Sequence, residues 1–426
     1  MLLLFLVINI ISYGGKKCQI FSIKIQMLER NLLRDICANL IDFIKNIILS
    51  DKFLSAHKQS PKFFTRNRIL PFHIIIFFLM NLIKGSYQEE LDYFFKAIEH
   101  SESFVRRVTK SAFCIARKKL KFEAFINLNR EAVSYFYHHF KPRKWFGFTL
   151  LAIDGSTVKI PKTPEVEKHF GVWNANSQNP CPLARISQLF DVLNKITVDA
   201  VISPKAAGEM ELCETDHFLM LQSDHLLLLD RGYPAYWLFN LILSLGSNFC
   251  ARVQARKWIS IRKFHRSGKM EQIIHLKAPA SSIPKCRELG MEPIDLKLRL
   301  IRVELDNGET EILITSLLDM EKYPLEIFLD LYHSRWPIEE DYKVMKCRIE
   351  IENFTGKSVL SVYQDFHARI FSKNLTAILA FPTHQIFEQN SEGKKYQYQL
   401  NLTQVLSKMK DSIILLFNRP LDMVKI

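Results

Sequence analysis

Two short apolar runs that each end in an aspartate constrain this chain more than any other feature. The first, residues 149–154, reads TLLAID, and the second, residues 225–230, reads HLLLLD. Short apolar runs of this kind are typical of strands buried inside a sheet. The ends of such strands are where α/β sheets collect their chemistry. Asp154 and Asp230 are therefore the first candidate functional residues, although the pair Asp154-Gly155 is also a common turn sequence.

The surrounding pattern predicts an α/β core between two helical regions. From residue 27 to about residue 140, apolar residues recur at spacings of three and four, which predicts helices. Residues 186–203 predict two strands joined at 193–195, whereas residues 208–222 and 235–246 predict helices. The core therefore begins near residue 149, where the apolar spacing changes.

A β-rich segment is expected after the second aspartate. Residues 255–320 have this character, and their Asp306-Asn307-Gly308 sequence is a strong hairpin signal. Helical patterns return from 324 to about 350 and dominate 354–426. A strand-rich insertion is therefore expected between Asp230 and the next helices.

The distribution of charge narrows the class of partner. The net charge is 58 − 44 = +14, which points to a polyanion, while 48% hydrophobic residues exclude a mostly disordered chain. Residues 1–150 hold 24 basic and 11 acidic side chains, and residues 251–300 hold 12 and 4. By contrast, residues 201–250 hold 2 and 6, and residues 301–350 hold 6 and 12. The chain therefore alternates basic blocks with acidic ones, unlike a uniformly basic protein.

A third acid lies in residues 334–346, SRWPIEEDYKVMK, which contain Glu339. Two strand aspartates and one helix glutamate can form the all-oxygen site that Mg²⁺ or Mn²⁺ prefers. Carboxylates gathered this closely repel one another unless a cation or protons neutralise them. Two such ions about 4 Å apart can activate water and stabilise the leaving 3′ oxygen in phosphodiester cleavage.

The residues around Glu339 follow a regular spacing. Four of them stand at i, i+3, i+7 and i+14, near one face of a helix: Tyr332, Arg335, Glu339 and Lys346. On this interpretation the acid binds metal and the other three contact phosphates beside it. Pro337 predicts that the helix begins just before it, which would leave the first two residues on the lead-in. An ordinary amphipathic helix with ion pairs is the alternative.

A basic segment in the N-terminal region is a candidate for DNA contact. Ser111 is a plausible N-cap for a helix with the sequence SAFCIARKKLKFEAF. That helix would carry Arg117, Lys118, Lys119 and Lys121 beside an apolar face, as expected of contact with the DNA backbone or groove. A merely solvated charged face is the alternative.

The cysteines and the apolar segments exclude several classes. No two of the eight cysteines are spaced Cys-x-x-Cys, which argues against a zinc ribbon or a redox motif. The apolar run at residues 1–12 is too short to span a bilayer. A signal peptide is one interpretation, but no basic residue precedes the run, and sequence upstream of a true start at Met27 is the preferred interpretation. The apolar run 69–83 is predicted to be a buried core helix.

With these motifs the sequence resembles the DDE transposases of insertion-sequence family 4, the cut-and-paste group that carries the YREK signature. The resemblance covers most of the chain. It is carried by AIDGS around Asp154, LLLDRGY around Asp230 and YHSRWPIEEDYKVMK around Glu339. It implies an RNase H-like catalytic core with a β-rich insertion between the second aspartate and the glutamate.

The resemblance also implies roles for individual residues. Asp154, Asp230 and Glu339 would be catalytic and would hold Mg²⁺ (or Mn²⁺), with two ions per active site. The residues expected to contact the backbone of the transposon end are Tyr332, Arg335 and Lys346. Related enzymes stack a flipped base on a tryptophan of the insertion. Trp258, the only tryptophan between 237 and 336, is the candidate here, although an interior tryptophan is more often part of the core.

These inferences define an expected domain organisation. The expected parts are an apolar leader at 1–26, a helical DNA-binding domain at 27–145, a catalytic core at 146–350 with the insertion at about 248–322, and a helical C-terminal region at 351–426.

The expected function is that of a transposase in the bacterial cytoplasm, associated with the nucleoid. It would bind terminal inverted repeats and target DNA as a dimer in a synaptic complex, and it would catalyse Mg²⁺-dependent strand cleavage and transfer. One alternative is a catalytically inactive DNA-binding remnant or repressor of transposition. Another is a membrane-associated protein, which the acidic segments around Asp230 and Glu339 disfavour.

Overall fold

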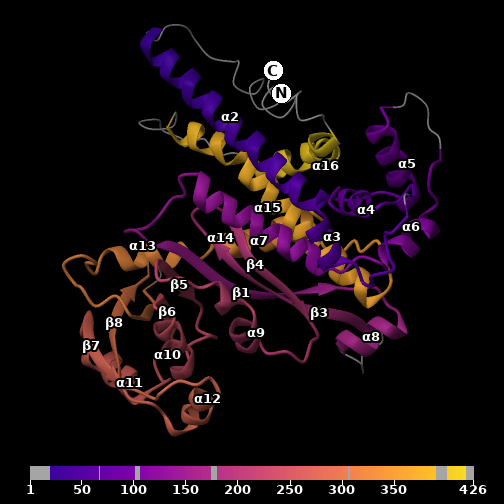
Figure 1. Ribbon diagram of the computed structural model, residues 1–426. Coiled ribbons are helices and arrows are strands. Elements are labelled where there is room, and N and C mark those ends of the chain that lie inside the picture. The colour runs from indigo at the N-terminus through magenta and orange to yellow at the C-terminus, as the bar shows by residue number, and fades with distance from the viewer. Residues whose placement is uncertain are drawn as a thin grey trace. The chain divides into compact units, whose positions relative to one another are not determined.

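The computed structural model describes residues 20–66, 68–100, 106–173, 180–305, 308–389 and 401–418. The chain divides into two compact units. The helical unit comprises the ranges Met1–Pro142, Val158–Leu183 and Lys343–Ile426, and the sheet unit comprises Arg143–Thr157 and Ala184–Tyr342. Figure 1 shows both units, with their helices and strands labelled where there is room.

A mixed sheet dominates the sheet unit. Its strands are β1 (Thr149–Lys159), β3 (Cys181–Asp191), β4 (Ile196–Ser203), β5 (His225–Leu229), β6 (Asn248–Val253), β7 (Glu271–Leu276), β8 (Leu296–Glu304) and β9 (Thr310–Thr315). β4 pairs with β3, which is followed across the sheet by β1, β5, β6, β9, β8 and β7. β1, β5 and β6 run parallel, whereas the pairings from β6 to β7 are antiparallel.

Helices flank this sheet. The helix α10 (Tyr236–Ser244) packs on β6, and α13 (Ile327–His333) packs on β8. After β4 come α9 (Glu209–Thr215) and the 3₁₀ helix η1 (His217–Met220), of which η1 packs on β4. A mixed sheet flanked by helices confirms the expected α/β class.

The strand that carries Asp154 is longer than predicted. β1 continues through Asp154 and Gly155 to Lys159, so the prediction that it ends at the aspartate was wrong. The first five residues of the strand are buried and the next four are half-buried. The apolar run therefore marks where the strand is covered on both faces, not where the extended backbone ends. The two strands predicted within 186–203 are confirmed as β3 and β4.

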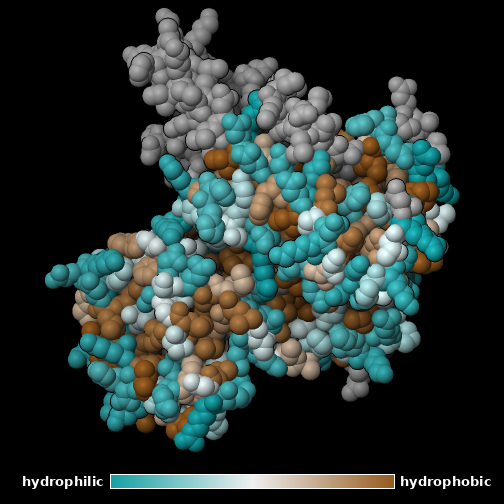
Figure 2. Space-filling model, in the orientation of Figure 1, coloured by the Kyte–Doolittle hydropathy of each residue, from teal (hydrophilic) through white to brown (hydrophobic). Residues whose placement is uncertain are grey.

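The insertion contains helices as well as strands. α11 (Ile259–Ser267) packs against β7 and β8, and α12 (Ile283–Glu288) packs against α10. Of the predicted hairpin turn, residues 306 and 307 lie outside the described residues. Gly308 has a φ of +79°, and the strands on either side pair antiparallel with Glu304 opposite Thr310. On the face shown in Figure 2, hydrophobic residues gather over the β6–β8 part of this unit.

The helical unit is built around a long C-terminal helix. Its helices are α2 (Ile20–Leu49), α3 (Asp51–His57), α4 (Phe72–Leu79), α5 (Tyr87–Ile98), α6 (Lys110–Arg117), α7 (Glu123–His139), α8 (Pro164–Phe170), α15 (Val359–Gln389) and α16 (Leu402–Asn418). α15 packs against α7, α4, α8 and α16. The short strand β2 (Val172–Trp173) pairs with Cys181 and Pro182 at the start of β3.

Within the apolar run 69–83, α4 covers Phe72–Leu79 and most of its side chains are buried, as predicted, whereas Ile69 before it is exposed. The Phe78 ring lies 5.3 Å from Phe94 and 4.6 Å from Phe113, edge to face in both cases. Such aromatic contacts join α4 to α5 and α6. None of the helices in the described part of the chain has the length and apolar character needed to cross a membrane. Residues 1–19, which hold most of the expected leader, lie outside the described residues.

Candidate active site

The sheet register brings the two strand aspartates together. The parallel pairing of β1 with β5 ends with Ile153 opposite Leu229. Asp154 and Asp230 are the next residues on these two neighbouring strands. Because adjacent strands lie about 4.8 Å apart, the two backbones leave the paired ladder side by side. The sequence prediction that both aspartates follow apolar strands to one place in the sheet is therefore supported by the register.

The glutamate reaches the same place from a helix. α14 (Pro337–Cys347) begins at Pro337, as its proline predicted, and Glu339 lies in its first turn. Arg335 lies just before this helix and is only 7% exposed. Its Nη2 donates to Glu339 Oε1 at 2.6 Å, and its Nη1 lies 4.0 Å from Asp154 Oδ2. The guanidinium thus connects a strand acid to the helix acid.

The second strand acid is held by a tyrosine. Tyr332 lies on α13, and its hydroxyl donates to Asp230 Oδ1 at 3.4 Å. Burial raises the pKa of Tyr332, and the negative charge of Asp230 raises it further, so the phenol stays neutral and keeps its proton to donate. Tyr332 and Arg335 belong to the lead-in before α14 and not to the helix that carries Glu339.

Burial, the neighbouring charges and a hydrogen bond together set the pKa of the Asp154 carboxyl. Burial raises its pKa to about 6, and the negative charges of Glu339 and Asp230 act in the same direction. The N–H of Gly155, which donates to Asp154 Oδ1 at 2.9 Å, and the charge of Arg335 oppose this rise. The pKa of Asp154 is raised overall, and burial is the largest cause.

The chemistry of these groups fits a divalent cation. Three carboxylates supply hard oxygen ligands, and their mutual repulsion calls for a positive charge among them. Among the described residues, no three His, Cys, Asp or Glu side chains lie close enough together to hold a metal ion. The cation that stands beside the acids is the Arg335 guanidinium, which bonds to Glu339 and lies near Asp154.

A residue that the sequence reasoning missed also contacts this site. Tyr342 lies three residues after Glu339 on α14, and its hydroxyl donates to the backbone oxygen of Asp154 at 2.6 Å. Burial raises its pKa well above the usual value, so the hydroxyl stays protonated. Its spacing of i+3 from Glu339 places both on one side of the helix, which was the only signal in the sequence.

Lys346 and Trp258 are two further candidates that the sequence predicted for DNA contact. Lys346 lies on α14 two turns after Glu339 and is half-buried. Trp258 is the residue just before α11, and it is half-buried with its ring edge-to-face with Phe239 at 6.0 Å. Phe239 in turn stacks on Phe249 of β6. Trp258 is thus partly packed against the core of the sheet unit.

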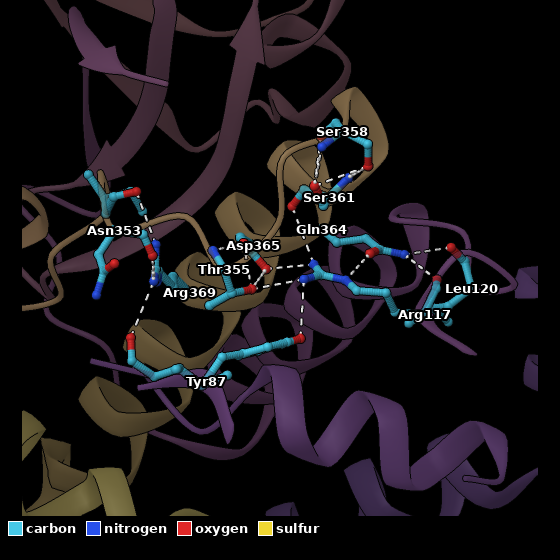
Figure 3. A network of polar contacts seen from close by, with 12 residues as sticks. Tyr87, Arg117, Leu120, Asn353, Thr355, Ser358, Ser361, Gln364, Asp365 and Arg369 are labelled. Atoms are coloured by element: carbon cyan, nitrogen blue, oxygen red, sulfur yellow. Dashed lines mark hydrogen bonds and ion pairs between the residues drawn. The ribbon is translucent and has the colours of Figure 1, made fainter. Parts of the chain in front are cut away.

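The prediction that Arg117 contacts DNA was wrong, because its side chain is buried inside the helical unit. Arg117 is 2% exposed, and its Nη2 donates to Asp365 Oδ1 at 2.6 Å. Its Nε donates to Gln364 Oε1, and its Nη1 donates to Thr355 Oγ1, both at 2.8 Å. Figure 3 shows this network, which ties α6 to the start of α15. A guanidinium so enclosed has a structural role and offers no surface to a phosphate.

The lysines beyond Arg117 do not lie on a helix. α6 ends at Arg117. Its N-cap is Thr109, whose hydroxyl accepts a hydrogen bond from the Ala112 N–H. The prediction that Ser111 caps this helix was therefore also wrong. The following segment instead pairs with the residues just after α3, since the Gln59 N–H donates to the Lys119 carbonyl at 2.8 Å. Lys118 is exposed and Lys119 is half-buried, so both keep surface for an anionic partner.

Comparison with known proteins gives the class of protein that this fold and site define. The family model of the transposase DDE domain matches residues 145–375, more than half of the chain, and the chain therefore belongs to this family. The matched range contains all three acids together with Tyr332, Arg335 and Lys346.

Individual relatives are more distant. The chain is 27% identical to the transposase InsG for insertion sequence element IS4 of Escherichia coli (strain K12) over 254 residues, which are 59% of this chain and 56% of that protein. It is also 27% identical to the putative transposase InsZ of the same organism over 158 residues, 33% of this chain and 53% of that protein. The chain thus spans about half the length of these curated relatives.

Among solved structures, the cryo-EM structure of the piggyBac transposase synaptic complex with hairpin DNA resembles this chain with a TM-score of 0.47 and 9% identity, covering 89% of this chain and 81% of that one. The recognition of a DDE transposase from the sequence is confirmed by the family match. The expected α/β class, with further strands between Asp230 and Glu339, is shown by the sheet itself.

Proposed function

We propose that this protein binds the terminal inverted repeats of an insertion sequence and catalyses metal-dependent DNA strand cleavage and strand transfer. The observation that carries the proposal is that Asp154 lies next to Asp230 in the sheet and is linked to Glu339 by one guanidinium. The first two follow paired residues of neighbouring strands, and the third is joined to Asp154 through Arg335. Membership of the transposase DDE domain family supports the reaction class.

The three carboxylates are the residues that would hold Mg²⁺ or Mn²⁺, and we propose two ions per site. When bound, such ions lower the pKa of water and stabilise the oxygen that leaves the phosphodiester. The contribution of the chain is to place the ligands by rigid elements, one on a strand, one directly after a strand and one in the first turn of a helix. Gly155 and Tyr342 restrain Asp154 by hydrogen bonds to its carboxylate and its carbonyl.

Arg335 and Tyr332 are proposed to bind the DNA strand at the scissile phosphate. The Arg335 Nε is buried and has no hydrogen-bond partner among the described residues, and a buried N–H without an acceptor is costly. A phosphate oxygen would satisfy it, and the planar guanidinium matches phosphate geometry. With the acids neutralised by a bound cation, Arg335 would be able to exchange Glu339 for the DNA backbone. Lys346 is proposed to add a further phosphate contact.

The insertion supplies a proposed surface for DNA. Along α11, Ile261 and Phe264 are buried, whereas Arg262, Lys263 and Arg266 are exposed. The helix therefore turns its apolar side to the strands and its basic side to solvent. Such a basic helix face fits contact with a phosphate backbone. Trp258, just before this helix, is proposed to stack an unpaired base there, and two copies of the protein are proposed to pair the transposon ends.

The proposal is tested by incubating purified protein with a duplex that carries the flanking inverted repeat. With Mg²⁺ we expect a nick at the end of the repeat, and with EDTA we expect binding without a nick. Asp230→Asn should bind the repeat as the wild type does and leave it uncut. Cutting by this variant at the wild-type rate would contradict the assignment.

A second function, DNA binding without catalysis, is favoured by one observation. The ion pair of Arg335 with Glu339 occupies an oxygen that the metal would need. If that pair persists when DNA is bound, the protein would act as an inactive relative that represses transposition. Binding of the repeat without any nick over a range of Mg²⁺ and Mn²⁺ concentrations is the result that would favour this function.

A further inference from the structure

Three buried polar side chains form a chain of contacts behind Asp154. Asp199 lies on β4, His217 begins η1, and Ser187 lies on β3. The His217 Nδ1 lies 2.8 Å from Asp199 Oδ2, and its Nε2 lies 2.9 Å from Ser187 Oγ. Their exposed fractions are 5% for Asp199, 0% for His217 and 1% for Ser187. Neither the sequence pattern nor the proposed reaction assigns them a role.

The chain of contacts ends on the backbone of the catalytic strand. The Ser187 hydroxyl donates to the carbonyl oxygen of Asp154 at 3.4 Å, and the Tyr342 hydroxyl donates to the same oxygen at 2.6 Å. This carbonyl belongs to the first residue of β1 beyond the parallel pairing with β5. Beyond the pairing with β5, this carbonyl is therefore bonded by two side-chain donors, while β3 lies on the other side of β1.

The arrangement has the order of a serine–histidine–aspartate triad but not its chemistry. A nucleophilic serine must reach a substrate, and this one is buried with its hydroxyl directed at a backbone oxygen. The imidazole is held between a carboxylate and a hydroxyl, which fixes its ring and, through it, the hydroxyl. Buried polar networks that are fully satisfied in this way rigidify the part of the core that they contact.

We propose that Asp199, His217 and Ser187 are positioning residues that act together with Tyr342 to fix the Asp154 backbone and so direct its carboxylate toward a divalent cation. The inference rests on the proposed metal-dependent function of the same site. Outer-shell partners of metal ligands typically change metal affinity or activity by about 10–100-fold when they are removed. Removing a buried group that restrains the backbone of a metal ligand should reduce metal affinity or activity by a similar factor.

The test compares two buried serines of the sheet unit. Ser187→Ala removes the relay hydroxyl. Ser247→Ala is the matched control, because Ser247 is also 1% exposed and its hydroxyl donates to a backbone carbonyl, that of Gln222, at 2.7 Å. Both variants should lose similar stability in urea denaturation. Mn²⁺ binding is measured by electron paramagnetic resonance on the full chain, and cleavage of the inverted repeat is measured across Mg²⁺ concentrations.

We expect Ser187→Ala to weaken Mn²⁺ binding about tenfold and to raise the half-maximal Mg²⁺ concentration by the same factor, while Ser247→Ala changes neither. Tyr342→Phe should shift both in the same direction. Asp199→Asn, which keeps an oxygen toward His217, should bind Mn²⁺ nearly as the wild type does. Equal Mn²⁺ affinity in Ser187→Ala and Ser247→Ala would overturn the inference, even if the wild type cleaves DNA. A wild type that binds Mn²⁺ without cleaving would instead overturn the proposed function alone.

Discussion

At the scale of single residues, Asp154 shows how one carboxyl opposes folding and serves the site. Its pKa is raised from 3.8 to about 6, chiefly by burial and also by its acidic neighbours. An acid whose pKa rises on folding prefers to be protonated in the folded state. Its ionisation therefore lowers stability as pH increases from about 4 to above 6. A bound cation would reverse this penalty.

Asp154→Asn should consequently stabilise the metal-free protein above pH 6 by about 2 kcal/mol, because asparagine cannot ionise. The gain should shrink toward zero as pH falls to about 4, where the wild-type carboxyl is protonated in the folded state. Urea denaturation in EDTA at a series of pH values measures the difference. If Asp154→Asn were stabilised equally at pH 4 and pH 8, the raised pKa of the buried Asp154 carboxyl would be refuted.

Arg117 was expected to contact DNA because it is basic, but its buried environment gives it a structural role. The replacement Arg117→Met should destabilise the fold by about 3–5 kcal/mol, because it leaves Asp365 buried without its partner. Lys118→Met, at the exposed neighbouring position, should change stability little and weaken DNA binding. Denaturation and binding assays on both variants separate the two effects. If Arg117→Met remained as stable as Lys118→Met, the enclosed ion pair would be refuted.

At the scale of elements, the start of α6 can be tested with two adjacent candidates. Thr109→Ala should cost about 1 kcal/mol, because its hydroxyl accepts from the Ala112 N–H at 3.2 Å. Ser111→Ala, at the cap position that the sequence indicated, should change the free energy of unfolding by only a few tenths of a kcal/mol. Both side chains are exposed, so the comparison isolates the cap. A larger loss of stability in Ser111→Ala than in Thr109→Ala would show that Ser111 caps the helix, as the sequence predicted.

The elements that the sequence predicted correctly are those with a strong local signal. The buried runs of β5 and α4, the turn between β3 and β4, and the proline that begins α14 were all recognisable. The end of β1 was not, because an extended backbone continues after its apolar run stops. The cap of α6 was missed because Thr109 and Ser111 are both good caps, and only tertiary packing selects one.

The candidate site was predictable only in part, for a similar reason. Asp154, Asp230 and Glu339 stand out because a family motif surrounds each of them. The ion pair of Arg335 with Glu339, the Tyr342 bond to the Asp154 carbonyl and the His217 relay join residues from separate elements. Such contacts depend on the register of strands and on packing, which spacing along the chain does not reveal.

At the scale of the whole molecule, the charge distribution predicts how DNA binding depends on salt. The net charge is +14, and residues 251–300 hold 12 basic side chains against 4 acidic ones. Removing one side chain that neutralises a phosphate should reduce the slope of log K against log salt by about 0.9. Replacing Arg262, Lys263 and Arg266 with Gln should therefore lower the slope by about 2–3. An unchanged slope would show that the exposed side of α11 does not face DNA.

The central claim, that Glu339 completes a metal-dependent site with the two strand aspartates, is tested most directly by a pair of neighbours on α14. Glu339→Gln and Glu340→Gln remove the same charge one residue apart, and Glu339 bonds to Arg335 beside Asp154. The measurement is the Mg²⁺-dependent rate of nicking at the inverted repeat, with end binding measured in parallel. We expect Glu339→Gln to lose a hundredfold or more, on the order of what removing a metal ligand implies, and Glu340→Gln to cleave nearly as the wild type does. Equal cleavage by the two variants would contradict the account.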